Sequence, residues 1–156
     1  MGAILLGFVV PLALAAQDIA LPVEIRRQVD AVHAGWTLAT VMPEVESEIR
    51  ERTPSWPPNL IVGDFDGNRQ TDVAVLVEYP EPKFPGGRAV QLFAFLGNGT
   101  SFAKFVLEPP APVDSRQFLH LVREPGTSDA IGVEYEAIGG HAWRFRNGKW
   151  QSSLAQ

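Results

Sequence analysis

The sequence predicts an α+β fold that is mostly antiparallel β, with an N-terminal helix followed by one or two four-stranded, blade-like meanders. Three observations support this prediction. Apolar residues near the N-terminus recur at helical spacing, residues 59–156 contain a series of short apolar runs, and Gly, Pro and Asn separate those runs. The runs are too few for a complete β-propeller, because a closed ring needs at least about four blades.

The first sixteen residues have the pattern of a secretory signal peptide. Residues 4–14 are almost wholly apolar, and Ala13-Leu14-Ala15 is a small-x-small cleavage pattern. The run is shorter than the roughly 20 apolar residues that span a membrane. No Lys or Arg precedes it, so a buried N-terminal strand or helix is the alternative. We expect residues 1–16 to be removed, and 17–156 to form a single secreted or periplasmic domain without stable membrane insertion.

Composition limits the classes of partner. A chain of this size buries roughly two-thirds of its unfolded surface and can fold without staples. It contains no cysteine, so disulfides are excluded and a bound metal would be a local substitute. The net charge is −5 and no basic stripe is visible, so we do not expect nucleic acid as a partner.

The N-terminal helix is predicted from residue 21 onward. Pro22 suits a first helical turn, and Ile25, Val29 and Val32 have the spacing of one buried stripe. Gly35 is placed to end the helix. The next segment, residues 36–42, is predicted as a short strand.

A second, shorter helical segment is predicted at residues 43–52. This segment is dense in charge, and its apolar residues Val45 and Ile49 lie four apart. We expect one or two helical turns that cover a sheet edge.

The first meander begins at residue 60. Residues 73–77 are apolar on both faces, which indicates a central strand covered on two sides. Asn98-Gly99 is a hairpin turn signal. The four predicted strands are residues 60–65, 72–79, 89–96 and 101–107.

Four shorter strands are predicted for the second half, at residues 117–123, 130–137, 141–146 and 149–152. A two-residue turn at Asn147-Gly148 would pair Phe145 with Trp150. Trp143, Phe145 and Trp150 would then share one face as an aromatic cluster.

The most informative motif is the loop at residues 64–72, Asp-Phe-Asp-Gly-Asn-Arg-Gln-Thr-Asp. Asp64, Asp66, Asn68 and Asp72 place oxygen-bearing side chains at positions one, three, five and nine, and the backbone carbonyl of Gln70 falls at position seven. Ca²⁺ binds several converging oxygens at about 2.3–2.6 Å. Three neighbouring carboxylates repel one another unless a cation neutralises them. The loop therefore predicts a structural calcium site, and the alternative is an acidic turn whose side chains cap backbone amides.

Residues 63–76, Gly-Asp-Phe-Asp-Gly-Asn-Arg-Gln-Thr-Asp-Val-Ala-Val-Leu, closely resemble the calcium motif of the FG-GAP and VCBS-type (integrin-like) repeats. Those repeats build β-propeller blades and hold calcium in a loop between two strands. The resemblance implies that Asp64, Asp66, Asn68, the Gln70 carbonyl and Asp72 are the ligands. The layout of the chain also loosely resembles short exported bacterial proteins that carry one such motif after an N-terminal helix.

Two residues depart from the pattern of these repeats. Asn68 replaces the more usual Asp, which lowers the ligand charge, and Arg69 stands where Gly is common. An EF-hand is a poorer match, because it needs Gly at position six and Glu at position twelve, where this chain has Arg69 and Val75.

Reaction chemistry has no clear signature in the sequence. There is no Gly-x-Ser-x-Gly elbow and no Cys nucleophile. His33, His120 and His141 are scattered without ligand spacing, so we expect packing or surface roles. No catalytic residue is therefore assigned.

A carboxylate pair is the strongest hint of an enzyme. Glu134 and Glu136 lie two apart on a predicted strand and would face the same side, and such a carboxylate pair could serve a glycosidase. The more ordinary interpretation is a solvated strand face with cross-strand ion pairs to Arg144 and Arg146.

The predicted function is that of an exported, non-catalytic, calcium-stabilised module that binds a protein or a glycan. Trp56 and Phe84 are the candidate contact residues, because both are aromatic residues on Pro-rich loops. The alternatives are a hydrolase that uses the carboxylate pair, and a blade subunit of an oligomeric ring.

Overall fold

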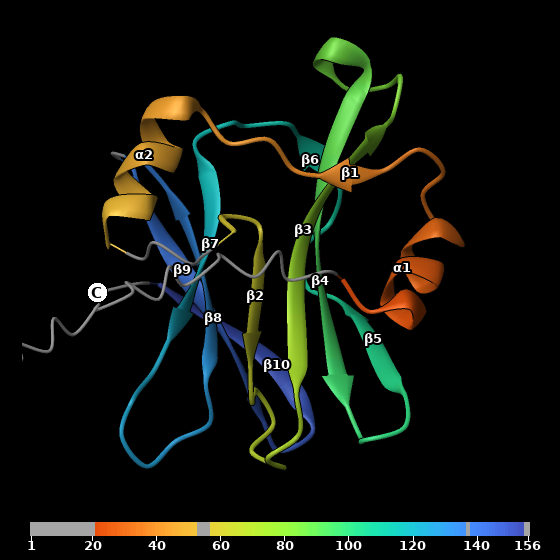
Figure 1. Ribbon diagram of the computed structural model, residues 1–156. Helices are drawn as coiled ribbons and strands as arrows, with labels where there is room; N and C mark the ends of the chain where they lie inside the picture. The colour runs from red at the N-terminus through yellow and green to blue at the C-terminus, as the bar shows by residue number, and fades with distance from the viewer. Residues whose placement is uncertain (1–20, 53–56, 137, 155–156) are drawn as a thin grey trace, which may run out of the picture.

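The computed structural model describes residues 21–52, 57–136 and 138–154. Within them, two open antiparallel sheets and two helices confirm the predicted α+β class (Figure 1). The helices are α1 (Val23–Asp30) and α2 (Pro43–Arg52), and a 3₁₀ turn η1 spans Pro85–Gly87. The first sheet contains β1 (Thr37–Leu38), β2 (Leu60–Gly63), β3 (Asp72–Pro80), β4 (Arg88–Gly97), β5 (Phe102–Val106) and β6 (Ala111–Pro112). The second contains β7 (Gln117–Val122), β8 (Ala130–Tyr135), β9 (Gly139–Arg146) and β10 (Lys149–Leu154).

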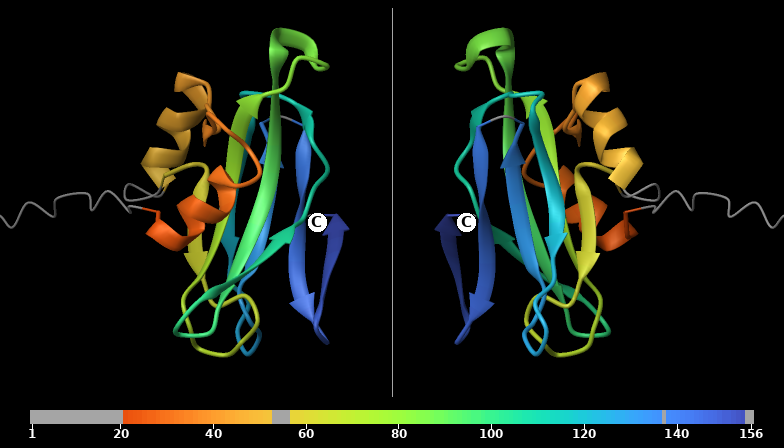
Figure 2. Two further views of the ribbon diagram at one scale, coloured as in Figure 1. Left: turned by 90° about the vertical axis from the view of Figure 1, so that its right-hand side faces the viewer. Right: turned by 90° about the vertical axis from the view of Figure 1, so that its left-hand side faces the viewer.

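The molecule has three layers, which Figure 2 shows edge-on: the helices, the first sheet and the second sheet. In the first sheet, β2, β3, β4 and β5 follow one another as the predicted meander. β1 pairs with β3 on the same edge as β2, and β6 pairs with β4 on the same edge as β5. In the second sheet the strands lie in simple sequence order. Neither meander closes on itself.

β3 is the central strand that its apolar sequence predicts. It pairs with β1 and β2 on one edge and with β4 on the other, and its first eight residues are all buried. Val73, Val75 and Val77 pack toward α1, while Ala74 and Leu76 pack toward the second sheet. Each face of β3 therefore contributes to a different core.

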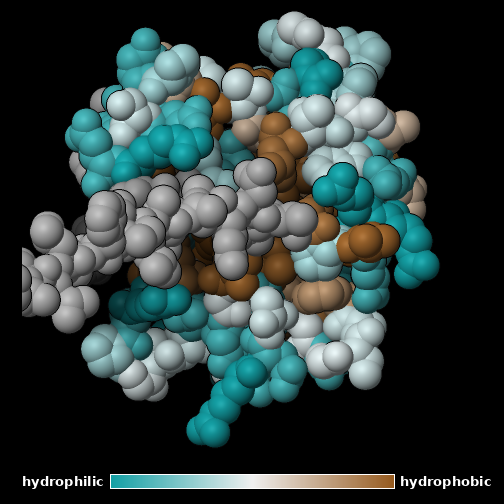
Figure 3. Space-filling view, in the orientation of Figure 1, coloured by the Kyte–Doolittle hydropathy of each residue, from teal (hydrophilic) through white to brown (hydrophobic). Residues whose placement is uncertain are grey.

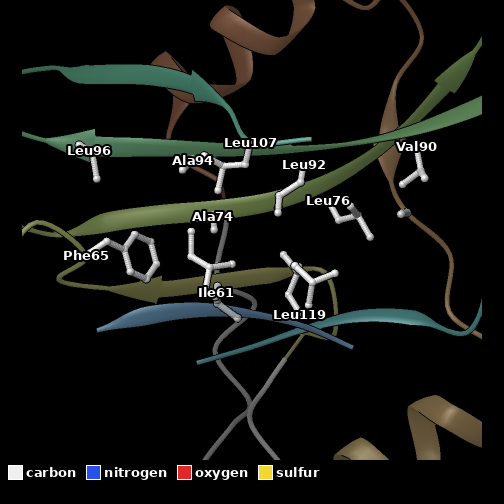
Figure 4. Packing of buried hydrophobic residues seen from close by; sticks show 13 residues of the cluster. Ile61, Phe65, Ala74, Leu76, Val90, Leu92, Ala94, Leu96, Leu107 and Leu119 are labelled. Atoms are coloured by element: carbon white, nitrogen blue, oxygen red, sulfur yellow. The ribbon is translucent and has the colours of Figure 1, made fainter. Parts of the chain in front are cut away.

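The core between the sheets is an interdigitated layer of aliphatic side chains. Ile61 and Leu76 of the first sheet lie against Leu119 of the second, and Phe65 closes one end (Figure 4). Close packing of this kind is the main source of stability in a domain of this size.

Helix α1 packs on the outer face of the first sheet through Ile25 and Val29. The prediction that Val32 belongs to this stripe is wrong, because α1 ends at Asp30 and Val32 is 48% exposed. The predicted strand at 36–42 is reduced to Thr37–Leu38, which pairs with β3.

Helix α2 lies beside the second sheet. Val45 and Ile49 are buried and form a small cluster with Val41, against which Met42 and Phe118 of β7 pack. The backbone N–H of Leu119 donates to the carbonyl of Pro58, 2.8 Å away, which ties β7 to the segment leading into β2. The packing of α2 on Phe118 of the edge strand β7 confirms the expected role of residues 43–52 as a helical cover over a sheet edge.

The last hairpin has the predicted register, because Phe145 pairs with Trp150 across the Asn147-Gly148 turn. The turn residues Asn147 and Gly148 have positive φ, 52° and 74°. The rings of Phe145 and Trp150 lie 5.3 Å apart, and Trp143 packs against the same core.

Figure 3 shows one face of the molecule, with hydrophobic side chains over the middle of the first sheet and a mostly hydrophilic surface around α2. Among the described residues, no helix is long and apolar enough to cross a membrane. The predicted signal peptide and Trp56 lie outside the described residues.

Candidate metal centre and its surroundings

The acidic loop joins β2 to β3, as predicted. Asp64 directly follows β2, and Asp72 is the first residue of β3. One carboxylate oxygen from each of Asp64, Asp66 and Asp72 lies within 4.8 Å of the other two. The structure therefore brings together the three acidic residues that the sequence predicts as ligands.

Backbone conformation explains two of the loop residues. Gly67 and Arg69 both have positive φ, 79° and 64°. Glycine adopts this conformation without steric cost, whereas a residue with a Cβ does so less readily. Arg69 is held there because its N–H donates to Asp64 Oδ2 at 3.0 Å. This geometry accounts for the Gly that the resemblance leads one to expect at position 69.

Side chains of the loop also cap its own backbone amides. Asp66 Oδ1 accepts the N–H of Asn68 at 3.0 Å, and Asn68 Oδ1 accepts the N–H of Gln70 at 2.6 Å. The Asn68 amide group donates to Asp66 Oδ2 and to the carbonyl of Gly97. These turns are the ones expected of a capped acidic loop, and they also set the alternating spacing of a cation-binding loop.

Asp72 is the buried end of the loop. It is fully buried, and its carboxylate accepts hydrogen bonds from the N–H groups of Phe65 at 2.6 Å and Gly97 at 2.7 Å. Burial raises the pKa of Asp72 and the negative charge of Asp66 raises it further, while the amide hydrogen bonds lower it in part. The ionised form is therefore held at a cost that a nearby cation would offset.

The donor set suits a hard cation. Asp64 Oδ1 is buried and has no hydrogen-bond partner among the described residues, so this carboxylate oxygen is available as a ligand. A carboxylate oxygen has two lone pairs, so the amide-bonded oxygens of Asp66 and Asp72 keep acceptor capacity. Oxygen-only donors favour Ca²⁺ or Mg²⁺ over softer metals.

Two residues distant in sequence, Asp129 and Gly97, complete the loop, and sequence reasoning missed both as site residues. The carboxylate of Asp129, directly before β8, accepts the Asp64 N–H at 3.0 Å, and the Asp129 N–H donates to the Asp64 carbonyl at 2.9 Å. Gly97 lies so close to the Thr71 carbonyl that a side chain at 97 would collide with it. A Cβ at Gly63 would lie 2.8 Å from the Phe65 ring and 2.9 Å from Asp129.

The described candidate contact residue, Phe84, packs back onto the molecule. It is half-buried against the core under α1, and the Lys83 ammonium lies 5.3 Å from the centre of its ring. A binding role for Phe84 stays a prediction.

The predicted ion pairs of the carboxylate pair are wrong. β8 ends at Tyr135, so Glu136 lies beyond the strand, and the register places Glu134 opposite Gly140. Glu134 instead lies 3.5 Å from His120, and Arg144 pairs with Glu124. These residues line a surface groove on the second sheet, which no sequence motif indicated.

The three histidines make polar contacts, in line with the packing roles expected of them. His33 Nε2 lies 2.8 Å from Gln91 Oε1, and its ring stacks on Tyr79 at 3.6 Å. His141 Nε2 lies 2.7 Å from Glu108 Oε1.

Comparison of this chain with family models, with curated proteins and with solved structures finds no match. The resemblance of the acidic loop to the FG-GAP and VCBS-type repeats therefore remains a prediction from residues 63–76.

Proposed function

We propose that this protein is an exported, non-catalytic module that a structural calcium ion stabilises and that binds a protein or a glycan. The ion would be held by Asp64, Asp66, Asn68, the Gln70 carbonyl and Asp72. The observation that carries the proposal is the convergence of three carboxylates, one with a buried oxygen that lacks a hydrogen-bond partner.

The structural role follows from where the loop lies. Its two ends are β2 and β3, and Asp129 ties it to the second sheet. A bound cation supplies positive charge that offsets the repulsion between the carboxylates and the cost of burying Asp72. Calcium would therefore fix the β2–β3 hairpin and, through Asp64, its contact with the β7–β8 connection.

Thermal unfolding in calcium and in chelator tests whether the protein binds a stabilising metal ion. With a dissociation constant of about 10⁻⁴ M, typical of extracellular modules, millimolar calcium stabilises the fold by about 1.4 kcal/mol. We expect the residues 17–156 protein to unfold at lower temperature in chelator than in calcium, and Asp66→Ala to lose this difference.

Asp114→Ala is the matched control, because Asp114 lies outside the loop and bonds to Arg116. This variant should keep the full calcium-dependent shift. If the wild-type protein unfolds identically in calcium and in chelator, the metal proposal is wrong.

Two other functions are separated by specific observations. A hydrolase is favoured by the presence of Glu134 in a groove that Glu124 also lines. A ring of blade subunits requires self-association, so a monomer in analytical sedimentation contradicts it.

A further inference from the structure

The outer face of the second sheet carries a groove of about 470 Å³. Its polar lining includes His120 from β7, Glu134 from β8, Arg144 from β9 and Glu124 from the β7–β8 connection. His141 and Ser153 also line it, and Val122 and Ala142 add apolar surface. This volume lies within the range of about 300–1,000 Å³ that is usual for sites of small ligands.

A glycine creates the recess beneath His120. His120 pairs with Gly132 across the β7–β8 ladder, and its imidazole ring lies where a Cβ of residue 132 would be. The ring can therefore lie against the sheet, within 3.5 Å of Glu134. Its side chain is 25% exposed, so the groove presents a held imidazole and not a freely rotating surface histidine.

The guanidinium of Arg144 is the most constrained polar group in the groove. Its side chain is 19% exposed, and Nη2 is paired with Glu124. Nη1 is buried and has no hydrogen-bond partner in the part of the chain that the structure describes. An unpaired buried donor is costly, so an acceptor that enters beside Arg144 gains a strong hydrogen bond. Glu124 lies on a connection and is 47% exposed, so it can move to admit that acceptor.

The arrangement of donors and acceptors selects the ligand. Two carboxylates face one guanidinium, so an anionic ligand meets net repulsion. The carboxylates accept hydrogen bonds, and Arg144 and Ser153 can donate them. The hydroxyl groups of a sugar do both, and its C–H faces match the apolar surface of Val122 and Ala142.

We propose that this groove binds a neutral saccharide, with Glu134 and Arg144 as the principal hydrogen-bonding residues. The proposal rests on the proposed function, because it takes the glycan as the ligand of the module and places its site. It requires no contribution from the acidic loop, so it can fail or succeed independently of calcium.

The test is a titration of the ¹⁵N-labelled residues 17–156 protein, followed by two-dimensional NMR. The probes are D-glucose, D-galactose, D-mannose and N-acetyl-D-glucosamine, each up to about 50 mM, so that dissociation constants in the millimolar range are detected. We expect at least one sugar to shift the amide signals of Val122, Ala142 and Ser153, and D-glucuronate to shift them less.

Matched variants locate the site. Glu134→Gln and Arg144→Gln should each weaken the binding roughly tenfold or more. Glu136→Gln and Arg146→Gln carry the same chemical changes two residues along, outside the groove, and should bind like the wild type. If Arg144→Gln does not fold, Glu134→Gln against Glu136→Gln still decides the question.

Three outcomes overturn the proposal: no shift in the groove with any of the four sugars, equal binding by Glu134→Gln and Glu136→Gln, or tighter binding of D-glucuronate. Repeating the titration in chelator separates the two proposals. Sugar binding that persists in a protein without a calcium-dependent melt supports the groove and contradicts the metal. A calcium-dependent melt without sugar binding does the reverse.

Discussion

The two sheets differ in what lies on their outer faces. The outer face of the first sheet is covered by α1, and Val75 and Phe93 on it are at most 1% exposed. On the outer face of the second sheet, the side chains of His120 and Glu134 are 25% and 40% exposed and line an open groove. Both sheets are antiparallel meanders, so pairing alone does not produce this difference.

The comparison shows how one strand geometry supports two roles. A sheet covered on both faces must carry apolar residues at successive positions, as β3 does. Burial of these residues on both faces stabilises the fold. A sheet covered on one face can carry polar side chains on its uncovered face, at every second residue of each strand. The first sheet therefore holds the fold, while the second carries the groove.

The largest expected effect compares two phenylalanines on the two outer faces. Phe93→Ala removes a ring buried beneath α1 and should lower the free energy of unfolding by about 3–5 kcal/mol. Phe118→Ala removes a half-buried ring beside α2 and should cost about 1 kcal/mol. Urea denaturation measures both. Equal losses would contradict the assignment of stability to the covered face.

A smaller effect on stability is expected when alanine replaces either of two glycines, Gly97 and Gly132. A side chain at Gly97 collides with the backbone carbonyl of Thr71, which cannot move away without disturbing the acidic loop. Gly97→Ala should therefore cost about 1–3 kcal/mol, as overpacked sites do. The three atoms nearest to a Cβ at Gly132 all belong to the His120 ring, and a side chain can be displaced more easily than a backbone carbonyl, so we expect a smaller loss of stability.

The two glycine variants differ in function as well. Gly132→Ala displaces His120 from the floor of the groove and should weaken sugar binding, whereas Gly97→Ala should leave the sugar affinity unchanged. A Gly132→Ala protein that is less stable than Gly97→Ala would show that the second sheet, not the acidic loop, is the tightly packed region.

The smallest expected effect is the pH dependence that His120, on the outer face of the second sheet, adds to the free energy of unfolding. Burial lowers the pKa of His120 from its ordinary value of 6.5, and the charge of Glu134 opposes this only in part. Below 6.5 the unfolded chain binds the proton more readily than the folded one, so stability falls as the pH falls through that window. Above 6.5 the contribution is complete.

Urea denaturation of the wild type and His120→Asn, between about pH 5 and 8, checks this effect. One titrating group gives a slope of at most about 1.4 kcal/mol per pH unit. The variant should lack the part of the slope that His120 supplies. An identical slope in both proteins would show that His120 takes up its proton equally in the folded and unfolded states.

The best sequence predictions concern features whose cause is local. The two-faced apolar run at 73–77 indicated a central strand, and Asn147-Gly148 fixed the register that pairs Phe145 with Trp150. The acidic loop was also visible, because Asp64, Asp66 and Asp72 lie within nine consecutive residues. In each case the residues that determine the structure are close together in the chain.

The failures concern residues whose partners are distant. The sequence suggested cross-strand ion pairs from Glu134 and Glu136 to Arg144 and Arg146. In the structure Arg144 pairs with Glu124, and the β8–β9 register sets Glu134 opposite Gly140. Val32 was expected in the core because its spacing matches α1, yet the helix ends two residues before it. Periodicity locates a stripe but does not say where the partner surface stops.

By itself the sequence determined most of the secondary structure of the meanders and the grouping of the acidic residues in one loop, because turn conformation, strand alternation and the spacing of neighbouring carboxylates depend on adjacent residues. Only the tertiary structure decided that Asp129 and Gly97 complete that loop, since Asp129 comes from the β7–β8 connection and Gly97 from β4. It also decided that α1 covers one sheet, while His120 and Glu134 on the outer face of the other stay partly exposed in the described part of the chain. That choice depends on which surfaces meet when the layers pack, and no local pattern records it.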